Sequence, residues 1–214
     1  FHGDGSGRLN NGPEIDIEVK ADNDGRIFQV SSNNAGEVLL ESNIYSSGYG
    51  GEIEIELVQS PESDSLGNIN VRNLRVIEAP FLAKLISLTS IMGIIDVLSS
   101  NGIMFENIWA EYQINKDILK ITNGIAISPS IGLTLSGTRE MDQKIINYSG
   151  VLSPAYSLNG MIKKIPLIGG VLGGNEGEGA FGINYFAKGK INNPEIRVNP
   201  LSFIAPGQFR KFVN

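Results

Sequence analysis

IWAEYQINKDILKI, residues 108–121, consists of two short runs of alternating apolar and polar residues joined by a polar turn. Apolar side chains occupy every second position on both sides of the turn: Ile108, Ala110, Tyr112, Ile114, Leu119 and Ile121. Successive side chains of a strand point to opposite faces, so a period of two indicates strands with one buried face. The stretch therefore predicts an antiparallel hairpin that turns at 115–117.

The same period of two recurs on both sides of this hairpin. It is found at 15–19, 53–57, 69–76, 125–127, 131–135, 145–152 and 181–189, and a further strand is expected at 26–31 after the turn at 21–26. Turn-forming segments separate the runs, such as ADNDGR at 21–26 and the segment 137–143. Short strands at this spacing favour an antiparallel meander in a mainly β fold. Each run is apolar on one face only, so the sheet has an apolar face that must be covered or used for binding.

Three apolar segments have helical spacing instead. A short helix is expected within 32–43, and an apolar helical insert is expected at 80–99 in two pieces. Pro80 suits the first turn of that insert, where a missing N–H is tolerated. A further apolar helix is expected at 157–172 and is split by Pro166. We expect these helices to cover or cap the apolar sheet face; membrane contact of the insert is the alternative.

Length and composition bound the organisation of the chain. It has 214 residues, of which 41% are hydrophobic and 19% are charged, which is typical of a globular domain. We treat 1–214 as a single domain with four parts: β hairpins and one short helix at 1–79, the helical insert at 80–100, a β meander at 103–152, and capping helices, final strands and a tail at 153–214.

The first residues of the sequence and its most apolar stretch give two further expectations. The chain begins with Phe1 in a strand-like segment, and we expect it to be the C-terminal fragment of a longer protein. The longest charge-free apolar stretch, 85–95, is too short to span a bilayer, which needs about 20 residues.

Charge and residue usage exclude several classes of function. The formal net charge of −6 disfavours nucleic-acid binding, which needs a basic surface. The chain has no cysteine, which excludes disulfides, thiolate catalysis and cysteine-based zinc sites. His2 is the only histidine, so neither a histidine-based catalytic triad nor a multi-histidine metal site is expected. Glu52, Glu54 and Glu56 share one strand face and are predicted to be solvated, not catalytic.

The glycine-rich part of 165–186 raises one more alternative. Gly177, Gly179 and Gly182 match the G-x-G-x-x-G pattern of dinucleotide-binding folds. That pattern requires a strand before it and a helix after it, whereas here a helix or loop precedes and a strand follows. The glycines are better suited to a tight connection between the helix and the strand. The sequence therefore predicts no enzyme activity, no cofactor and no bound metal.

Five segments of the C-terminal third are specific as an ordered set: PAYSLNG (154–160), IPLIGGVLGG (165–174), EGEGAFG (176–182), NPEIRVNPLS (193–202) and APGQFRKF (205–212). Following a β meander with an apolar helical insert, they resemble the C-terminal region of AsmA-like bacterial envelope proteins of the YhdP type. The resemblance extends from about Gly51 to Phe212. It implies a large protein that is anchored by an N-terminal segment in the inner membrane of a Gram-negative bacterium and crosses the periplasm as a long, curled β-sheet. The apolar groove of that sheet is thought to carry phospholipid toward the outer membrane, without catalytic residues.

The resemblance and the one-sided strands together predict a curled sheet, shaped as a β-groove or half-barrel like a taco, whose apolar side contacts lipid. The residues expected to contact acyl chains are Ile53, Ile55, Leu57, Leu85, Ile94, Leu133, Leu135, Leu167, Ile168, Phe181 and Ile183. Those expected to contact headgroups are Lys163, Lys164, Arg210 and Lys211.

The expected function is therefore that of a periplasmic module that conducts phospholipid or another acyl lipid between the inner and outer membranes. A membrane surface or an envelope protein is a further expected partner. The alternative is a structural or assembly module of the envelope, with a fully internal core, that docks an envelope partner. Burial under a helix and burial under acyl chains require the same residues, so the sequence leaves both functions open.

Overall fold

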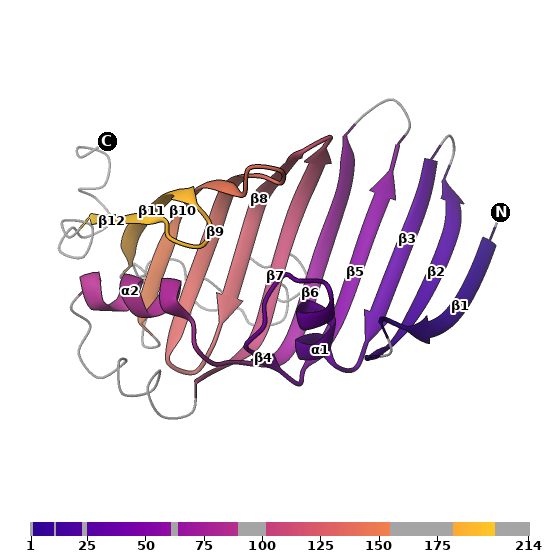
Figure 1. Ribbon diagram of the computed structural model, residues 1–214, viewed down its shortest axis with the longest axis horizontal. Helices are drawn as coiled ribbons and strands as arrows, with labels where there is room; N and C mark the ends of the chain where they lie inside the picture. The colour runs from indigo at the N-terminus through magenta and orange to yellow at the C-terminus, as the bar shows by residue number, and fades with distance from the viewer. Residues whose placement is uncertain are drawn as a thin grey trace, which may run out of the picture.

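The structure, a computed structural model, describes residues 2–10, 12–22, 25–60, 64–89, 102–154 and 182–199. Its twelve strands form one antiparallel sheet that is not closed into a barrel (Figure 1). The strands are β1 (His2–Arg8), β2 (Glu14–Asp22), β3 (Gly25–Ser32), β4 (Gly48–Tyr49), β5 (Glu52–Gln59), β6 (Ser65–Val76), β7 (Ile103–Asn115), β8 (Ile118–Ile127), β9 (Ile131–Glu140), β10 (Ile145–Pro154), β11 (Ile183–Lys190) and β12 (Glu195–Asn199). Two short helices accompany them, α1 (Ala35–Glu41) and α2 (Pro80–Thr89). The predicted mainly β, antiparallel fold with short helices is confirmed.

The order of the strands in the sheet follows the order of the chain. From β1 to β12 each strand pairs with the next, except that the two-residue β4 lies off this path and pairs with β6. The meander predicted for 103–152 is therefore present and continues over the whole sheet. One predicted turn is wrong. β9 runs through Gly137 to Glu140, because Gly137 still pairs with Tyr148 of β10, and the chain turns at 141–144.

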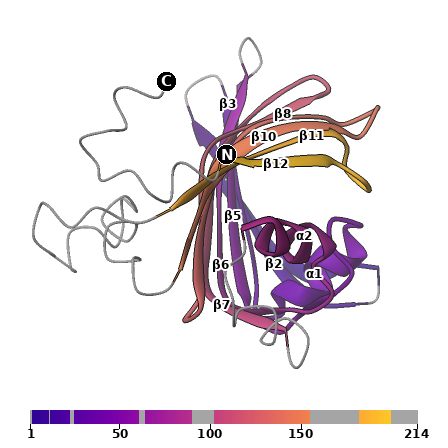
Figure 2. The ribbon, with the colours of Figure 1, turned by 90° about the vertical axis from the view of Figure 1, so that its left-hand side faces the viewer.

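The sheet is curved, and both helices lie on its concave side (Figure 2). The same view shows the ends of β8, β10 and β11 bending over toward that side. The second piece of the predicted insert, up to 99, and the predicted helix at 157–172 lie outside the described residues.

The period of two in the strands turns their apolar side chains to the concave side. On β5, Ile53 pairs with Val71 of β6, and both are buried beneath α1. Glu54, the next residue, pairs with Asn70 and projects from the convex side. Because antiparallel partners that stand opposite each other share a face, the pairing transmits this division from strand to strand.

The helices cover two buried clusters on the concave side. The cluster under α1 consists of Ala35, Val38, Leu39, Ile53, Val71 and Leu74. The cluster under α2 consists of Leu82, Leu85, Ile86, Ile103, Phe105, Ile131, Ile146, Leu152, Tyr185, Ala187 and Ile196. Two contacts hold α2 against the last strands. Phe81 meets Tyr185 edge to face, with ring centroids 5.9 Å apart, and Lys84 Nζ donates to the carbonyl of Pro194 at 3.3 Å.

Two tyrosines each cross a glycine of the neighbouring strand and bond to the strand beyond it. Tyr185 of β11 lies over Gly150 of β10, and its hydroxyl donates to the carbonyl oxygen of Thr134 on β9 at 2.7 Å. Tyr112 of β7 lies over Gly67 of β6, and its hydroxyl donates to a backbone carbonyl of β5 at 3.2 Å. In both places the aromatic ring occupies the space that a side chain on the glycine would fill, which is a known way to stabilise glycine within a sheet.

Replacement of Gly150 by alanine tests this arrangement. The new methyl group would meet the carbonyl oxygen of Thr134 and the hydroxyl of Tyr185, so the backbone or the ring must move. We expect a loss of about 1–3 kcal/mol in the free energy of unfolding, measured by urea denaturation. Gly7→Ala is the matched control, because nothing lies within 4 Å of a methyl group there. Equal stabilities of the two variants would contradict the proposed packing.

The buried hydroxyl of Tyr185 predicts a loss of stability in alkali. Burial raises the pKa of Tyr185 above its ordinary value. The unfolded chain releases this proton near pH 10, whereas the folded chain retains it, so the free energy of unfolding falls as the pH rises above about 10. In Tyr185→Phe this fall should be shallower, as measured by urea denaturation between about pH 8 and pH 11. Identical slopes in the two proteins would show that Tyr185 has no part in the transition.

Candidate functional site

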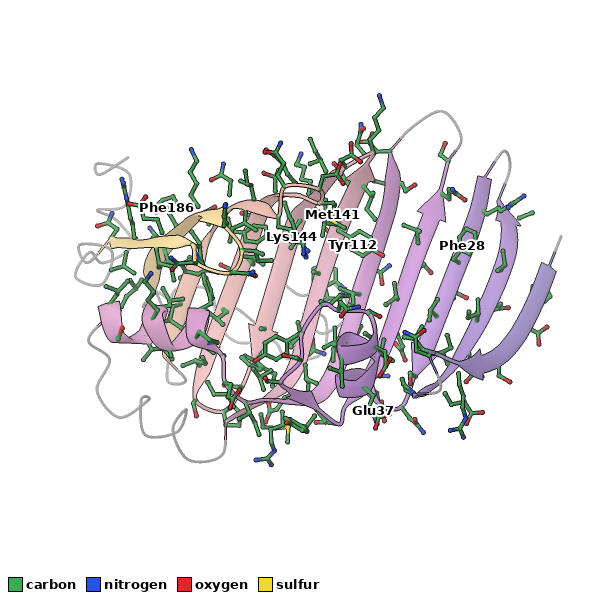
Figure 3. All side chains as sticks on the ribbon, in the orientation of Figure 1. Phe28, Glu37, Tyr112, Met141, Lys144 and Phe186 are labelled. Atoms are coloured by element: carbon green, nitrogen blue, oxygen red, sulfur yellow. The ribbon has the colours of Figure 1, made fainter. Side chains whose placement is uncertain are left out.

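A row of apolar side chains crosses the concave side of the sheet. It consists of Val19, Phe28, Leu57, Tyr112 and Ile121, which are cross-strand neighbours from β2, β3, β5, β7 and β8, with the β6 glycine lying beneath Tyr112. We name this row the apolar strip; Phe28 and Tyr112 mark it in Figure 3. Neighbouring strands are about 4.8 Å apart, so the five spacings from β2 to β8 make the strip about 24 Å long.

The helices leave the apolar strip uncovered. All five of its side chains are half-buried, and none belongs to the two clusters beneath α1 and α2 or to the apolar residues packed against them. Beyond Val19, β1 turns Gly3, Gly5 and Gly7 to the same side, so no side chain of β1 closes that end of the row. A contiguous apolar surface is a candidate binding surface for an apolar partner.

The structure divides the predicted acyl-chain contacts into two groups. Ile53, Leu85 and Ile183 are 2%, 0% and 3% exposed, so they belong to the interior of the protein and offer no surface to a ligand. Four others keep part of their surface accessible: Ile55, Leu57, Leu133 and Leu135. Ile55 packs at the margin of the cluster under α1, Leu133 and Leu135 pack at the margin of the cluster under α2, and Leu57 is a member of the apolar strip.

The remaining predicted contacts lie outside the described residues. These are the acyl-chain contacts Ile94, Leu167, Ile168 and Phe181 and the headgroup contacts Lys163, Lys164, Arg210 and Lys211.

The sequence did not identify four members of the apolar strip as site residues, namely Val19, Phe28, Tyr112 and Ile121. The alternation assigns each of them to the apolar face of its own strand. Which residues of different strands stand at one level depends on the register of pairing, and alternation carries no register. The cross-strand pairs of the structure supply that information.

The convex side has a different character. A shallow depression of about 740 Å³ lies over β1, β2, β3, β5 and β6 and is lined by polar side chains that include Asp4, Asp16, Glu18, Glu54 and Glu56. The predicted solvated glutamates lie here. Arg72 is within 3.2 Å of a Glu52 carboxylate oxygen and within 2.6 Å of one on Glu54. No group of three or more acidic or histidine side chains among the described residues could hold a metal ion.

Comparisons with models of protein families, with curated proteins and with solved structures found no match. The resemblance to AsmA-like proteins therefore stays a prediction. Within the ranges that the structure describes, neither helix is long and apolar enough to cross a membrane.

Two alanine substitutions on β5 separate the core from the apolar strip. Ile53→Ala creates a cavity beneath α1, and we expect it to lower the free energy of unfolding by about 2–5 kcal/mol. Leu57→Ala removes a half-buried side chain from the same face of the same strand, and we expect a loss of about 1 kcal/mol. Urea denaturation of the two variants measures both values. A larger loss for Leu57→Ala would show that the strip is part of the stabilising core.

Proposed function

We propose that this protein binds the acyl chain of a lipid along the apolar strip and conducts it across the sheet without chemistry. The single observation that carries the proposal is the half-buried strip itself, which the two helices leave uncovered while they bury two clusters on the same apolar face. A bilayer core is about 30 Å thick, so one acyl chain extends over about 15 Å, and the strip is long enough to hold it lengthwise.

The direction of the strip suits transfer. The strip runs across the strands, so an acyl chain lying on it would contact apolar side chains from one strand to the next. The glycines of β1 leave the β1 end of the row open. These features agree with the resemblance to AsmA-like proteins, and we therefore propose phospholipid as the ligand and the periplasm of a Gram-negative bacterium as the location.

The alternative, an assembly module whose apolar face is wholly internal, has less support. Such a module would bury the strip as completely as Ile53 or Leu85, yet Phe28, Leu57 and Tyr112 all retain accessible surface.

Photo-crosslinking tests the proposed function. A benzophenone amino acid at position 57 or 133 faces the concave side, and the same group at position 70 faces the convex side of the neighbouring strand. After irradiation in cells and purification, we expect lipid adducts at 57 and 133 and none at 70, detected by mass spectrometry. The absence of adducts at 57 and 133, or equal labelling at 70, would overturn the proposal.

A further inference from the structure

Arg139 of β9 lies on the apolar concave side, beside the β8 end of the apolar strip. Arg139 stands near the end of β9, directly opposite Leu119 of β8 and Ile146 of β10. Ile146 is buried in the cluster under α2, and residues directly opposite each other in an antiparallel pair share a face. The guanidinium of Arg139 therefore rises from the same side as the strip.

Arg139 has no partner among the described residues. Its Nε is buried and makes no hydrogen bond, and no described carboxylate lies within 4.0 Å of the guanidinium. Desolvating a charged donor without a partner is costly, so buried charges in proteins are normally paired. None of the described residues accounts for a cation at this position.

Tyr148 provides a second free donor close to Arg139. In the β9–β10 pairing, Tyr148 is the diagonal neighbour of Arg139 on the same face. Burial raises the pKa of the Tyr148 phenol, and the charge of Arg139 opposes that shift. No hydrogen bond joins the Tyr148 hydroxyl to another part of the described chain. The guanidinium and the phenol thus present uncommitted donors on one apolar surface.

Arg139 and Tyr148 lie at the β8 end of the apolar strip. Ile121, the last member of the strip, pairs with Gly137 of β9, and Gly137 pairs with Tyr148 of β10. Tyr148 is therefore next in line along the row, separated from Ile121 only by a residue that lacks a side chain. Arg139 is two residues further along β9. An amphiphile with its chain on the strip would bring its polar end to these donors.

We propose that Arg139 and Tyr148 bind the anionic headgroup, a phosphate or carboxylate, of the lipid whose acyl chain lies on the apolar strip. This inference rests on the proposed function and adds the site and charge of the headgroup. Guanidinium matches phosphate and carboxylate oxygens in a two-pronged geometry, and such charge-assisted hydrogen bonds strengthen away from water. The acidic side chains of β1, β2 and β5 project from the opposite face, so they do not compete for the arginine.

The test compares phosphatidic acid with diacylglycerol of the same acyl chains, because only the former carries an anionic headgroup. Both are offered in one vesicle preparation to protein with a benzophenone amino acid at position 57, and the ratio of the two adducts is measured. We expect the wild type to prefer phosphatidic acid. Arg139→Gln should lower that preference by about tenfold or more, since hydrogen bonds to charged groups are worth about 1.5–3 kcal/mol, and should retain labelling by diacylglycerol.

Three further variants make the comparison specific. Arg26→Gln removes an exposed arginine from the same concave face, beside Phe28 at the other end of the strip, and should keep the wild-type ratio. Tyr148→Phe should lower the ratio less than Arg139→Gln does. Arg139→Lys keeps the charge without the two-pronged geometry and should give an intermediate ratio, which preserves the test if Arg139→Gln folds poorly.

Stability gives an independent readout. Removal of an unpaired, partly desolvated charge is expected to leave lipid-free protein as stable as the wild type or more stable, whereas loss of a structural contact would destabilise it. A lower free energy of unfolding for Arg139→Gln, measured without lipid, would therefore count against a role in binding.

The outcomes separate the two proposals. An unchanged adduct ratio in Arg139→Gln would overturn the headgroup site and leave the proposed function intact. Absence of both adducts from the wild type would overturn the proposed function and the headgroup site together. If inorganic phosphate alone abolishes the preference for phosphatidic acid, Arg139 binds a free anion and the assignment to a lipid headgroup is wrong.

Discussion

Continuous antiparallel pairing across one sheet is the constraint on which this structure depends. Because every strand pairs with its neighbour in a fixed register, the apolar side chains of strand after strand face the same concave side. Two helices of 7 and 10 residues cover part of this surface. The remainder stays accessible at Phe28, Leu57 and Tyr112, and the uncovered part follows from the small area of the helices relative to the sheet.

The two halves of the concave side therefore differ in how deeply their apolar side chains are buried. The half beneath α1 and α2 is packed by residues such as Ile53, Leu85 and Leu152, whose burial stabilises the fold. The half that carries the apolar strip is less deeply buried and keeps accessible surface, to which the proposed lipid would bind. Tyr112 has both properties: its ring packs over Gly67, and part of its surface remains accessible.

Much of the fold could be predicted from alternation alone. The period of two at 108–121 locates β7 and β8, and the helical spacing after Pro80 locates α2. Alternation within one strand does not show how that strand pairs with its neighbours. Near Asn73, which has a φ of 55°, the apolar side chains of β6 change phase, and β7 changes phase at the same level, so their register is unbroken. The pattern of β6 alone cannot show that β7 changes phase at the same level and so keeps the register.

The candidate site could be predicted only in part, for a related reason. From the sequence, Leu57 and Leu133 could be recognised as apolar strand residues, whereas Arg139 could not be distinguished from an exposed charged residue near a turn. Its significance depends on standing opposite Ile146, which is buried. A cation on an apolar surface lowers stability unless something compensates for its desolvation. If the protein functioned only as a closed core, a neutral residue at 139 would serve better, whereas the proposed anionic headgroup would supply the missing partner. The acidic side chains of β1, β2 and β5 project from the other face, so they do not pair with Arg139.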